Sequence, residues 1–378
     1  MPSELRTLHD QRNRPRGLAA VVKPSPLFDL ILVLWSALGA DDKVAAHELG
    51  KGWFDRFRSS LSSDTKAAMA EVGGDYGALW LNLLGILEQA PTTDPEAMLT
   101  WLGEQDGRWL RRQMLAAHCA MEAADPTKVE ADLDAAAAGD LAAGDRLLEG
   151  PSGKHIPKRK RAAMHRLLTL PEAEVAGRLA GTLRAIRSDA FLPFEKEWAG
   201  PLTADATATR AKLAKTTSLP ALIEDITKGI SFEMPVGVAR LVLVPTVSLR
   251  PWTLVTDHES TMIVCYPVDS EHLTADPEAP PGWLLEAYKA LADENRLRIL
   301  RLISLRGTAT LAELTEHLGL AKSTVHHHLA VLRGAGLLRV QLDANDNASY
   351  ALRLEALPDA GRSLDGYLNQ PDEKGAIA

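Results

Sequence analysis

The sequence predicts a mainly α-helical protein with small β elements: a large helical N-terminal domain ending in a short β-sheet, followed by a smaller C-terminal domain of helices and strands. Two observations support this class. Apolar residues recur at helical spacings of three and four through most of the first part of the chain, whereas β-branched runs broken by Pro and Gly begin only near residue 230. A chain of 378 residues also exceeds one small domain, so two or three domains are expected.

The chain begins with a basic stretch. Residues 1–24 are polar and contain three closely spaced arginines (Arg12, Arg14 and Arg16), which predicts a flexible basic tail or, alternatively, an arm that touches DNA. A helix is expected to start at Ser25-Pro26, because proline suits a first helical turn, and to end at Gly39. The N-terminal sensor and dimerisation domain is therefore predicted over 25–269.

Amphipathic patterns predict most of that domain to be helical. Further helices are expected at 44–61, 76–89, 95–103, 108–121, 125–149, 161–187 and 205–215. Tryptophans recur in these segments and are hypothesised to line an apolar pocket, although such stripes more often belong to a core (Trp35, Trp53, Trp80, Trp101 and Trp109). The basic run at 158–161 is either a solvated helix start or a site for an anion or DNA phosphate.

A change of pattern marks the end of the helical part. The runs 230–236, 240–244 and 261–266 are short and rich in β-branched residues, so they predict a small sheet within 230–267. Asp257-His258-Glu259 is expected in a loop between strands. The following segment, 270–282, is polar and contains prolines, which predicts a linker.

Two short helices joined by a tight turn are predicted next. Thr308–Leu318 carries Leu311, Leu314 and Leu318 at helical spacing, and Gly319-Leu320-Ala321 supplies the turn. In Ala321–Arg333, three apolar residues share one face (Val325, Leu329 and Leu332), which leaves the opposite face free. This is the pattern of a helix-turn-helix, whose second helix enters the major groove of DNA by its N-terminal residues.

A wing completes this C-terminal domain. Gly334 and Gly336 are expected to end the second helix. The runs 337–342 and 349–353 are strand-like, and the residues between them favour turns. A winged helix-turn-helix is thus predicted over 283–368, followed by a tail at 369–378.

Two segments resemble a known family. Ala290–Leu300 and Ser323–Leu337 are similar to the ArsR-type winged helix-turn-helix transcriptional regulators of bacteria, and the N-terminal part is more weakly similar to the long N-terminal regions of some actinobacterial-type members. The resemblance implies a homodimer that binds a palindromic operator and usually represses. The helices at 283–291 and 356–368 are expected to help the two chains pair.

The candidate DNA-binding residues lie on the second helix and the wing strands: Lys322, Ser323, Thr324, His326, His327, His328, Arg333, Arg339 and Arg353. His326 and His327 are expected to face DNA, whereas His328 is expected either to contact a phosphate or to brace the turn. Asp343 and Asp346 at the tip of the wing would repel phosphate, so wing contacts are expected to depend on the two arginines of the strands.

Several other classes of function are disfavoured. The formal net charge of −8 argues against indiscriminate nucleic-acid binding, so a local patch must contact DNA. Consecutive histidines on a helix point about 100° apart and cannot converge on one metal ion. No cofactor or metal motif and no catalytic motif is recognised, and the longest apolar stretch, 27–38, is too short for a membrane span.

The predicted function is a sequence-specific DNA-binding transcriptional regulator, not an enzyme. It is expected to be a cytoplasmic homodimeric repressor of an inverted-repeat operator in double-stranded DNA, with an N-terminal domain that responds to a non-metal signal such as a small-molecule effector. Two alternatives remain open at this point: the N-terminal domain is a protein-interaction module, or it is an enzymatic domain fused to the winged helix.

Overall fold

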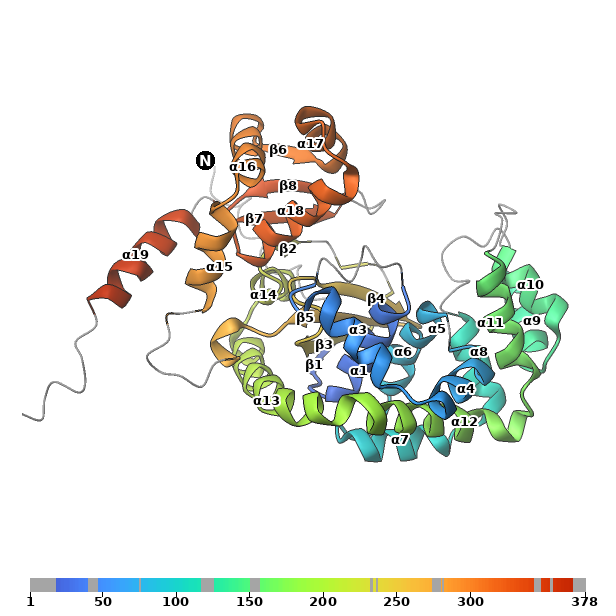
Figure 1. Cartoon of the computed structure of the whole chain (residues 1–378). Coiled ribbons are helices and arrows are strands. Elements are labelled where there is room, and N and C mark those ends of the chain that lie inside the picture. Colours follow the sequence, from blue (N-terminus) through green and yellow to red (C-terminus); the bar gives the residue numbers. More distant parts are fainter. Residues whose placement is uncertain are drawn as a thin grey trace, which may run out of the picture.

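Two four-stranded sheets organise the chain in the computed structural model (Figure 1). The structure describes residues 18–39, 47–74, 76–116, 126–149, 157–231, 234–235, 237–273, 280, 282–342, 348–353 and 356–369. We call the described residues up to 273 the N-terminal region and those from 282 the C-terminal region. Most of the expected basic tail, the tip of the wing and the tail at 370–378 lie outside the described residues.

The first sheet lies in the N-terminal region and has the order β1-β3-β5-β4. Its strands are β1 (Ala19–Val22), β3 (Arg240–Thr246), β5 (Thr261–Pro267) and β4 (Leu254–His258). β3 pairs in parallel with β1 and β5, and β4 pairs antiparallel with β5. Parallel strands need cover on both faces, and helices supply it here.

The side chains of β3 alternate between two hydrophobic layers. Leu241 and Leu243 belong to the layer formed with α13 (Leu192–Lys215) and α14 (Leu219–Ile226). Val242 and Val244 belong to the main core with α1 (Pro26–Ala37). Five consecutive residues of α1 are completely buried, which explains why its sequence is apolar all round (Leu30, Ile31, Leu32, Val33 and Leu34).

The remaining helices of the N-terminal region surround this core. They are α3 (Gly50–Ser60), α4 (Ser63–Glu71), α5 (Gly77–Leu81), α6 (Leu83–Leu87), α7 (Pro95–Gly103), α8 (Gly107–Ala116), α9 (Pro126–Ala137), α10 (Leu141–Glu149), α11 (Lys158–Thr169) and α12 (Glu172–Ile186), with a π-helical turn at Arg187–Phe191 before α13. The helical expectations hold in outline and the mainly α class is confirmed. Gly139 interrupts 125–149, and Pro171 separates α11 from α12.

Two expectations for the N-terminal region were wrong, and one with two possible outcomes is now decided. Ala19–Val22 forms strand β1 rather than continuing a tail, because it pairs with Arg240–Leu243. Asp257 and His258 lie on β4 rather than in a loop. The five tryptophans pack in or against the main core, with Trp53 and Trp80 buried, which is the more common of the two outcomes expected for them, and none of them lines the interregional cavity described below.

The C-terminal region contains the expected helix-turn-helix. Its elements are α15 (Gly282–Leu291), α16 (Glu294–Arg306), β6 (Thr308–Thr310), α17 (Leu311–Leu318), α18 (Lys322–Gly334), β7 (Leu338–Leu342), β8 (Ala348–Leu352) and α19 (Ala356–Leu368). Thr310 and Glu313 form a reciprocal capping box at the start of α17. Gly319 ends that helix at φ 63°, a left-handed conformation that favours glycine.

The second sheet is shared between the two regions. Its order is β2-β7-β8-β6, and β2 (Ile230–Ser231) comes from the N-terminal region. The expected strand at 230–236 therefore does not belong to the N-terminal sheet: Ile230 pairs in parallel with Val340. Gly229 permits this approach, because a Cβ there would lie 2.3 Å from the Leu338 carbonyl oxygen. In Figure 1, β2 lies below β7 where the two regions meet.

The segment expected to be a linker takes part in the same junction. Ser270–His272 forms a short 3-10 helix, η2, and Ser270 donates a hydrogen bond to Glu286 of α15. Residues 274–279 lie outside the described residues. None of the helices in the described ranges combines the length and apolar character needed to cross a membrane.

Candidate nucleic-acid interface

The N-terminal end of α18 is an exposed polar surface. Lys322, Ser323, Thr324 and His326 are all exposed. Ala321 precedes the helix in an extended conformation, and no side chain caps the first turn. The first backbone N–H groups of the helix are therefore available to an external acceptor such as a phosphate oxygen.

The opposite face of α18 holds the helix in the C-terminal core. Val325, Leu329 and Leu332 are at most 1% exposed and pack with Ile299 and Ile303 of α16. This is the face that the apolar spacing predicts. It fixes the orientation of the exposed end, because rotation of α18 would expose these three side chains.

His326 already has a partner from the N-terminal region. Its ring stands 5.0 Å from the ring centre of Trp252, with the two planes inclined by 35°. Burial against this ring lowers the pKa of His326, and the nearby positive charge of Lys322 lowers it further. The loop between β3 and β4 therefore contacts the recognition helix directly.

His327 and His328 lie on the sides of α18 rather than at its exposed tip. His327 is partly buried, and burial together with the charge of Arg296 lowers its pKa. His328 is buried, with Nδ1 3.8 Å from an Asp293 carboxylate oxygen. Of the two roles expected for His328, bracing the helix against the start of α16 fits this position better than contacting a phosphate.

Arg333 lies in a different environment from the one expected. It is 5% exposed and donates hydrogen bonds to the carbonyl oxygens of Thr227 (2.7 Å) and Pro251 (2.6 Å) and to the Thr253 hydroxyl. Burial lowers its pKa to about 10, so the guanidinium remains charged at pH 7. In this arrangement its donors are engaged by the N-terminal region, and the expected contact between Arg333 and DNA stays a prediction.

The two arginines expected to support the wing also lie near the junction. Arg339 forms an ion pair with Glu224 of α14. Arg353 lines a cavity between the regions. The wing tip, with Asp343 and Asp346, lies outside the described residues, so the expected wing contact with DNA stays a prediction.

A buried charge cluster joins the regions below α18. Glu286 of α15 accepts hydrogen bonds from Arg250 and Ser270 and lies 3.2 Å from Lys228 Nζ. Arg250 also binds Glu48 and the Val268 carbonyl. Sequence reasoning missed Trp252, Arg250 and Glu286. Trp252 and Arg250 flank Pro251 in a loop between two strands, and a large aromatic residue with an arginine at such a place indicates that the loop packs against another part of the protein.

Comparisons with known proteins agree with this geometry. A family model described as bacterial regulatory protein, arsR family, matches residues 293–340, which span α16 to the middle of β7. An HTH-type transcriptional regulator from Methanocaldococcus jannaschii is 31% identical over 65 residues, covering 17% of this chain and 73% of the relative. The chain belongs to the ArsR family. No solved structure matches it.

Membership of the ArsR family makes this protein a DNA-binding transcriptional regulator. The matched residues contain the helix-turn-helix and its exposed end but none of the N-terminal region. Among the described residues, no group of three or more His, Cys, Asp or Glu side chains is arranged to hold a metal ion. The large N-terminal region that contacts the end of α18 lies outside the residues that the family model matches.

Proposed function

We propose that this protein is a homodimeric repressor that binds an inverted-repeat operator in duplex DNA, with an N-terminal region that adjusts operator affinity in response to a non-metal signal. The observation that carries the proposal is the exposed first turn of α18, where Lys322, Ser323 and Thr324 surround a helix end without a side-chain cap. Together these groups offer the charge and donors that a groove edge and its phosphates accept.

The roles of these side chains follow from their chemistry. The Lys322 ammonium is suited to a phosphate, and the hydroxyls of Ser323 and Thr324 can donate to a phosphate or to a base edge. His326 presents a ring that lies 5.0 Å from the Trp252 ring, with a pKa lowered by burial. The overall negative charge of the chain gives no general attraction to DNA, so affinity depends on this small surface and on its duplication in a dimer.

The pairing of α15 with α19 supports a dimer. Leu284 and Ala287 of α15 pack against Ala360 of α19 in a small separate cluster. The same two helices expose apolar side chains: Leu285 at 43%, Tyr288 at 42% and Leu368 at 69%. Burial of such side chains against a second copy would stabilise a dimer. Two recognition helices would then reach half-sites about one helical turn, or roughly 34 Å, apart.

The attachment of α18 supports control by the N-terminal region. Arg333, the β2–β7 pairing and the Glu286 cluster each connect α18 or its neighbours to residues before 273. A change in the N-terminal region that alters these contacts would move or release the recognition helix. Repression that responds to a signal requires such a physical connection.

The deciding experiment is selection of bound DNA from a random duplex pool by the full-length protein, with its mass in solution measured by light scattering. The proposal expects an enriched inverted repeat and the mass of two chains. A reporter gene placed behind the selected sequence should fall in expression when the protein is present. A folded protein that enriches no sequence would overturn sequence-specific binding, and a monomer on DNA or a rise in reporter expression would overturn the dimer or the repressor assignment.

A further inference from the structure

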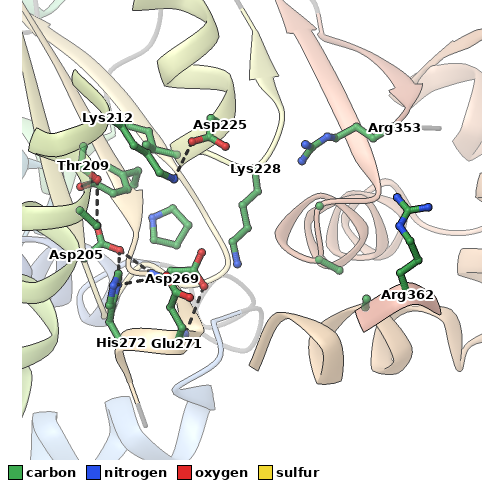
Figure 2. Close-up of a pocket in the computed structure, with 17 residues that line it drawn as sticks. Asp205, Thr209, Lys212, Asp225, Lys228, Asp269, Glu271, His272, Arg353 and Arg362 are labelled. Carbon is green, nitrogen blue, oxygen red and sulfur yellow. Dashed lines mark hydrogen bonds and ion pairs between the residues drawn. The ribbon is translucent and has the colours of Figure 1, made fainter. Parts of the chain in front are cut away.

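A cavity of about 510 Å³ lies between the two regions (Figure 2). Its N-terminal wall comes from α13, α14 and the end of β5 with η2. Its C-terminal wall comes from α15, the residues that follow α18 and β8, and α19. A volume of several hundred Å³ is typical of small-molecule sites. Unlike most such sites, this one has charged side chains at eight of its 17 lining residues.

The charges of opposite sign occupy different parts of the lining. Asp205, Asp269 and Glu271 lie together on the N-terminal wall beside His272, whereas Arg353 and Arg362 approach from the C-terminal wall. Figure 2 shows Lys228 between these two groups. Lys212 and Asp225 also line the cavity and bind each other at 2.8 Å. The arrangement is suited to a ligand with an anionic end and an end that donates hydrogen bonds.

The acidic side is held firmly in place. The buried carboxylate of Asp205 accepts a hydrogen bond from the Asp269 backbone N–H at 2.8 Å, and His272 Nδ1 lies 3.1 Å from the same oxygen. The Thr209 hydroxyl donates to the other oxygen at 3.5 Å and accepts from the Tyr266 hydroxyl at 3.0 Å. A carboxylate has about four acceptor positions in all, so this side can accept hydroxyl groups without rearrangement.

The basic residues of the lining come from three separate elements. Lys228 follows α14, Arg353 follows β8 and Arg362 lies on α19. Lys228 adopts φ 55°, a left-handed conformation that is unfavourable for a residue with a side chain. It lies 3.2 Å from Glu286, and an ammonium group carries three donors, so it can bind a second acceptor.

We propose that this cavity is the effector site and that it binds a phosphorylated polyol, the chemistry shared by sugar phosphates and nucleotides. The phosphate would lie on the side of the cavity lined by Lys228, Arg353 and Arg362, because guanidinium and ammonium groups match a doubly charged anion. The hydroxyls would donate to Asp205, Asp269 and Glu271. A ligand bound in this way spans both walls and fastens the C-terminal region to the N-terminal region.

The position of the cavity connects it to the recognition helix. Ala335 and Gly336, which end α18, line it directly. The ligand therefore stabilises the arrangement in which Trp252 contacts His326 and Arg333 is buried. Because that contact occupies part of the recognition surface, the ligand lowers affinity for the operator. This last step rests on the proposed function, whereas binding in the cavity does not.

The first test measures binding to the full-length protein without DNA by titration calorimetry. The probes are ribose 5-phosphate, glucose 6-phosphate and adenosine 5′-monophosphate. Inorganic phosphate and ribose serve as comparisons, because each contains only one of the two groups that the site would recognise. At least one phosphorylated probe should bind about tenfold more tightly than phosphate, and ribose should not bind; which probe binds best distinguishes a sugar phosphate from a nucleotide. Lys228→Gly and Arg362→Ala should each weaken that binding about tenfold.

The matched control is Arg146→Ala, which removes an exposed arginine of α10, far from the cavity in Figure 1. It should leave binding unchanged. The site is overturned if none of the three phosphorylated probes binds more tightly than inorganic phosphate, or if the two cavity variants bind like the control. Equal melting temperatures of all variants without ligand would show that the weakened binding does not come from unfolding.

The second test adds the best probe to the complex with the selected operator. The inference expects operator affinity to fall, and the operator to weaken probe binding by the same factor, because the two equilibria are linked. A probe that binds without changing operator affinity would overturn the coupling but leave the site. A protein that binds the probe but no operator would contradict the proposed function instead, so the two failures are distinguishable.

Discussion

The two halves of α18 have different surroundings although they belong to one short helix. The first turn, with Lys322, Ser323 and Thr324, is open to solvent. The last turn is enclosed by the N-terminal region: Arg333 is buried, and a Cβ added to Gly334 would lie 2.7 Å from the Pro251 Cβ. One end of the helix is suited to reading DNA and the other is attached to the rest of the protein.

This difference shows how a region outside the helix-turn-helix can control it. A helix is stiff over thirteen residues, so a displacement at its enclosed end is carried to its exposed end. The attachment should therefore affect operator affinity without any contact between the N-terminal region and DNA. Variants of the enclosed end, of the exposed end and of the contact between Trp252 and His326 should therefore have different effects on stability and on operator affinity.

The largest effect is expected at Asp29, which anchors the loop that encloses α18. Its buried carboxylate accepts three hydrogen bonds, from the backbone N–H groups of Val247 and Ser248 and from the Ser248 hydroxyl. Asp29→Ala leaves these donors buried without an acceptor and should lower the free energy of unfolding by about 3 kcal/mol in a urea titration. Asp29→Asn keeps an acceptor oxygen and should lose much less; equal losses would contradict the anchoring role.

The native protein and Asp29→Asn should also differ in how their stability depends on pH. Burial raises the pKa of Asp29 to about 7 from an ordinary value of 3.8, although the hydrogen bonds from Ser248 and Val247 act to lower it. The unfolded chain ionises first as the pH rises, so the native protein loses stability relative to Asp29→Asn between about pH 4 and pH 7 and not beyond. Urea titrations at pH 4.5 and pH 7.5 should show this change; a constant difference would mean that Asp29 is not destabilised by ionisation.

A smaller loss of stability is expected on replacement of Arg333, whose side chain donates hydrogen bonds to Pro251 and Thr253 of the loop between β3 and β4. Arg333→Ala removes three hydrogen bonds from a charged donor but also relieves the desolvation of a buried cation, so we expect a net cost of about 2 kcal/mol. Exchange of the Val340 amide hydrogen, which is bound to the Gly229 carbonyl at 2.6 Å across the junction, should become faster. Arg339→Ala is the matched control, since its ion pair with Glu224 is partly exposed and worth about 1 kcal/mol or less.

Much of the C-terminal region could be predicted because its signals are local. The leucine spacing of α17 and α18 and the turn residues between them are contained within a few helical turns, and the helices were found there. Arg333 could not be assigned in this way. It lies on the polar side of the helix, where a residue that contacts DNA and one that contacts another region of the same chain give the same pattern.

The misassigned strands have a similar cause. Val21 pairs with Val242 and Ile230 with Val340, so the partners are separated by long stretches of chain that no local pattern spans. The cavity shows the same limit. Asp205, Lys228 and Arg362 look like ordinary solvated charges in sequence, and only the packing of α13, α14 and α19 gathers them around one space.

The exposed half of α18 should respond in DNA binding and not in stability. Ser323→Ala removes one hydroxyl donor from the open first turn, so affinity for the selected operator should fall by roughly 1 kcal/mol, or about fivefold, in a fluorescence anisotropy titration. Ser63→Ala is the matched control, because Ser63 is likewise an exposed serine in the first turn of a helix, α4. Unchanged affinity of Ser323→Ala would contradict the assignment of this turn to the groove.

The smallest effect is expected where the two halves meet, at the contact between Trp252 and His326. Trp252→Ala removes the ring beside His326, a contact worth about 0.5–1 kcal/mol, and lessens the burial that lowers the pKa of His326. Two results should follow: the pKa of His326, followed by NMR, rises toward its ordinary value, and operator affinity increases about threefold because the loop no longer competes for the helix. Trp101→Ala, a partly buried tryptophan on α7, controls for loss of an aromatic elsewhere. A rise in the pKa without a gain in affinity would show that the loop steadies α18 rather than covering its reading surface, and the direction of control from the cavity would then have to be reversed.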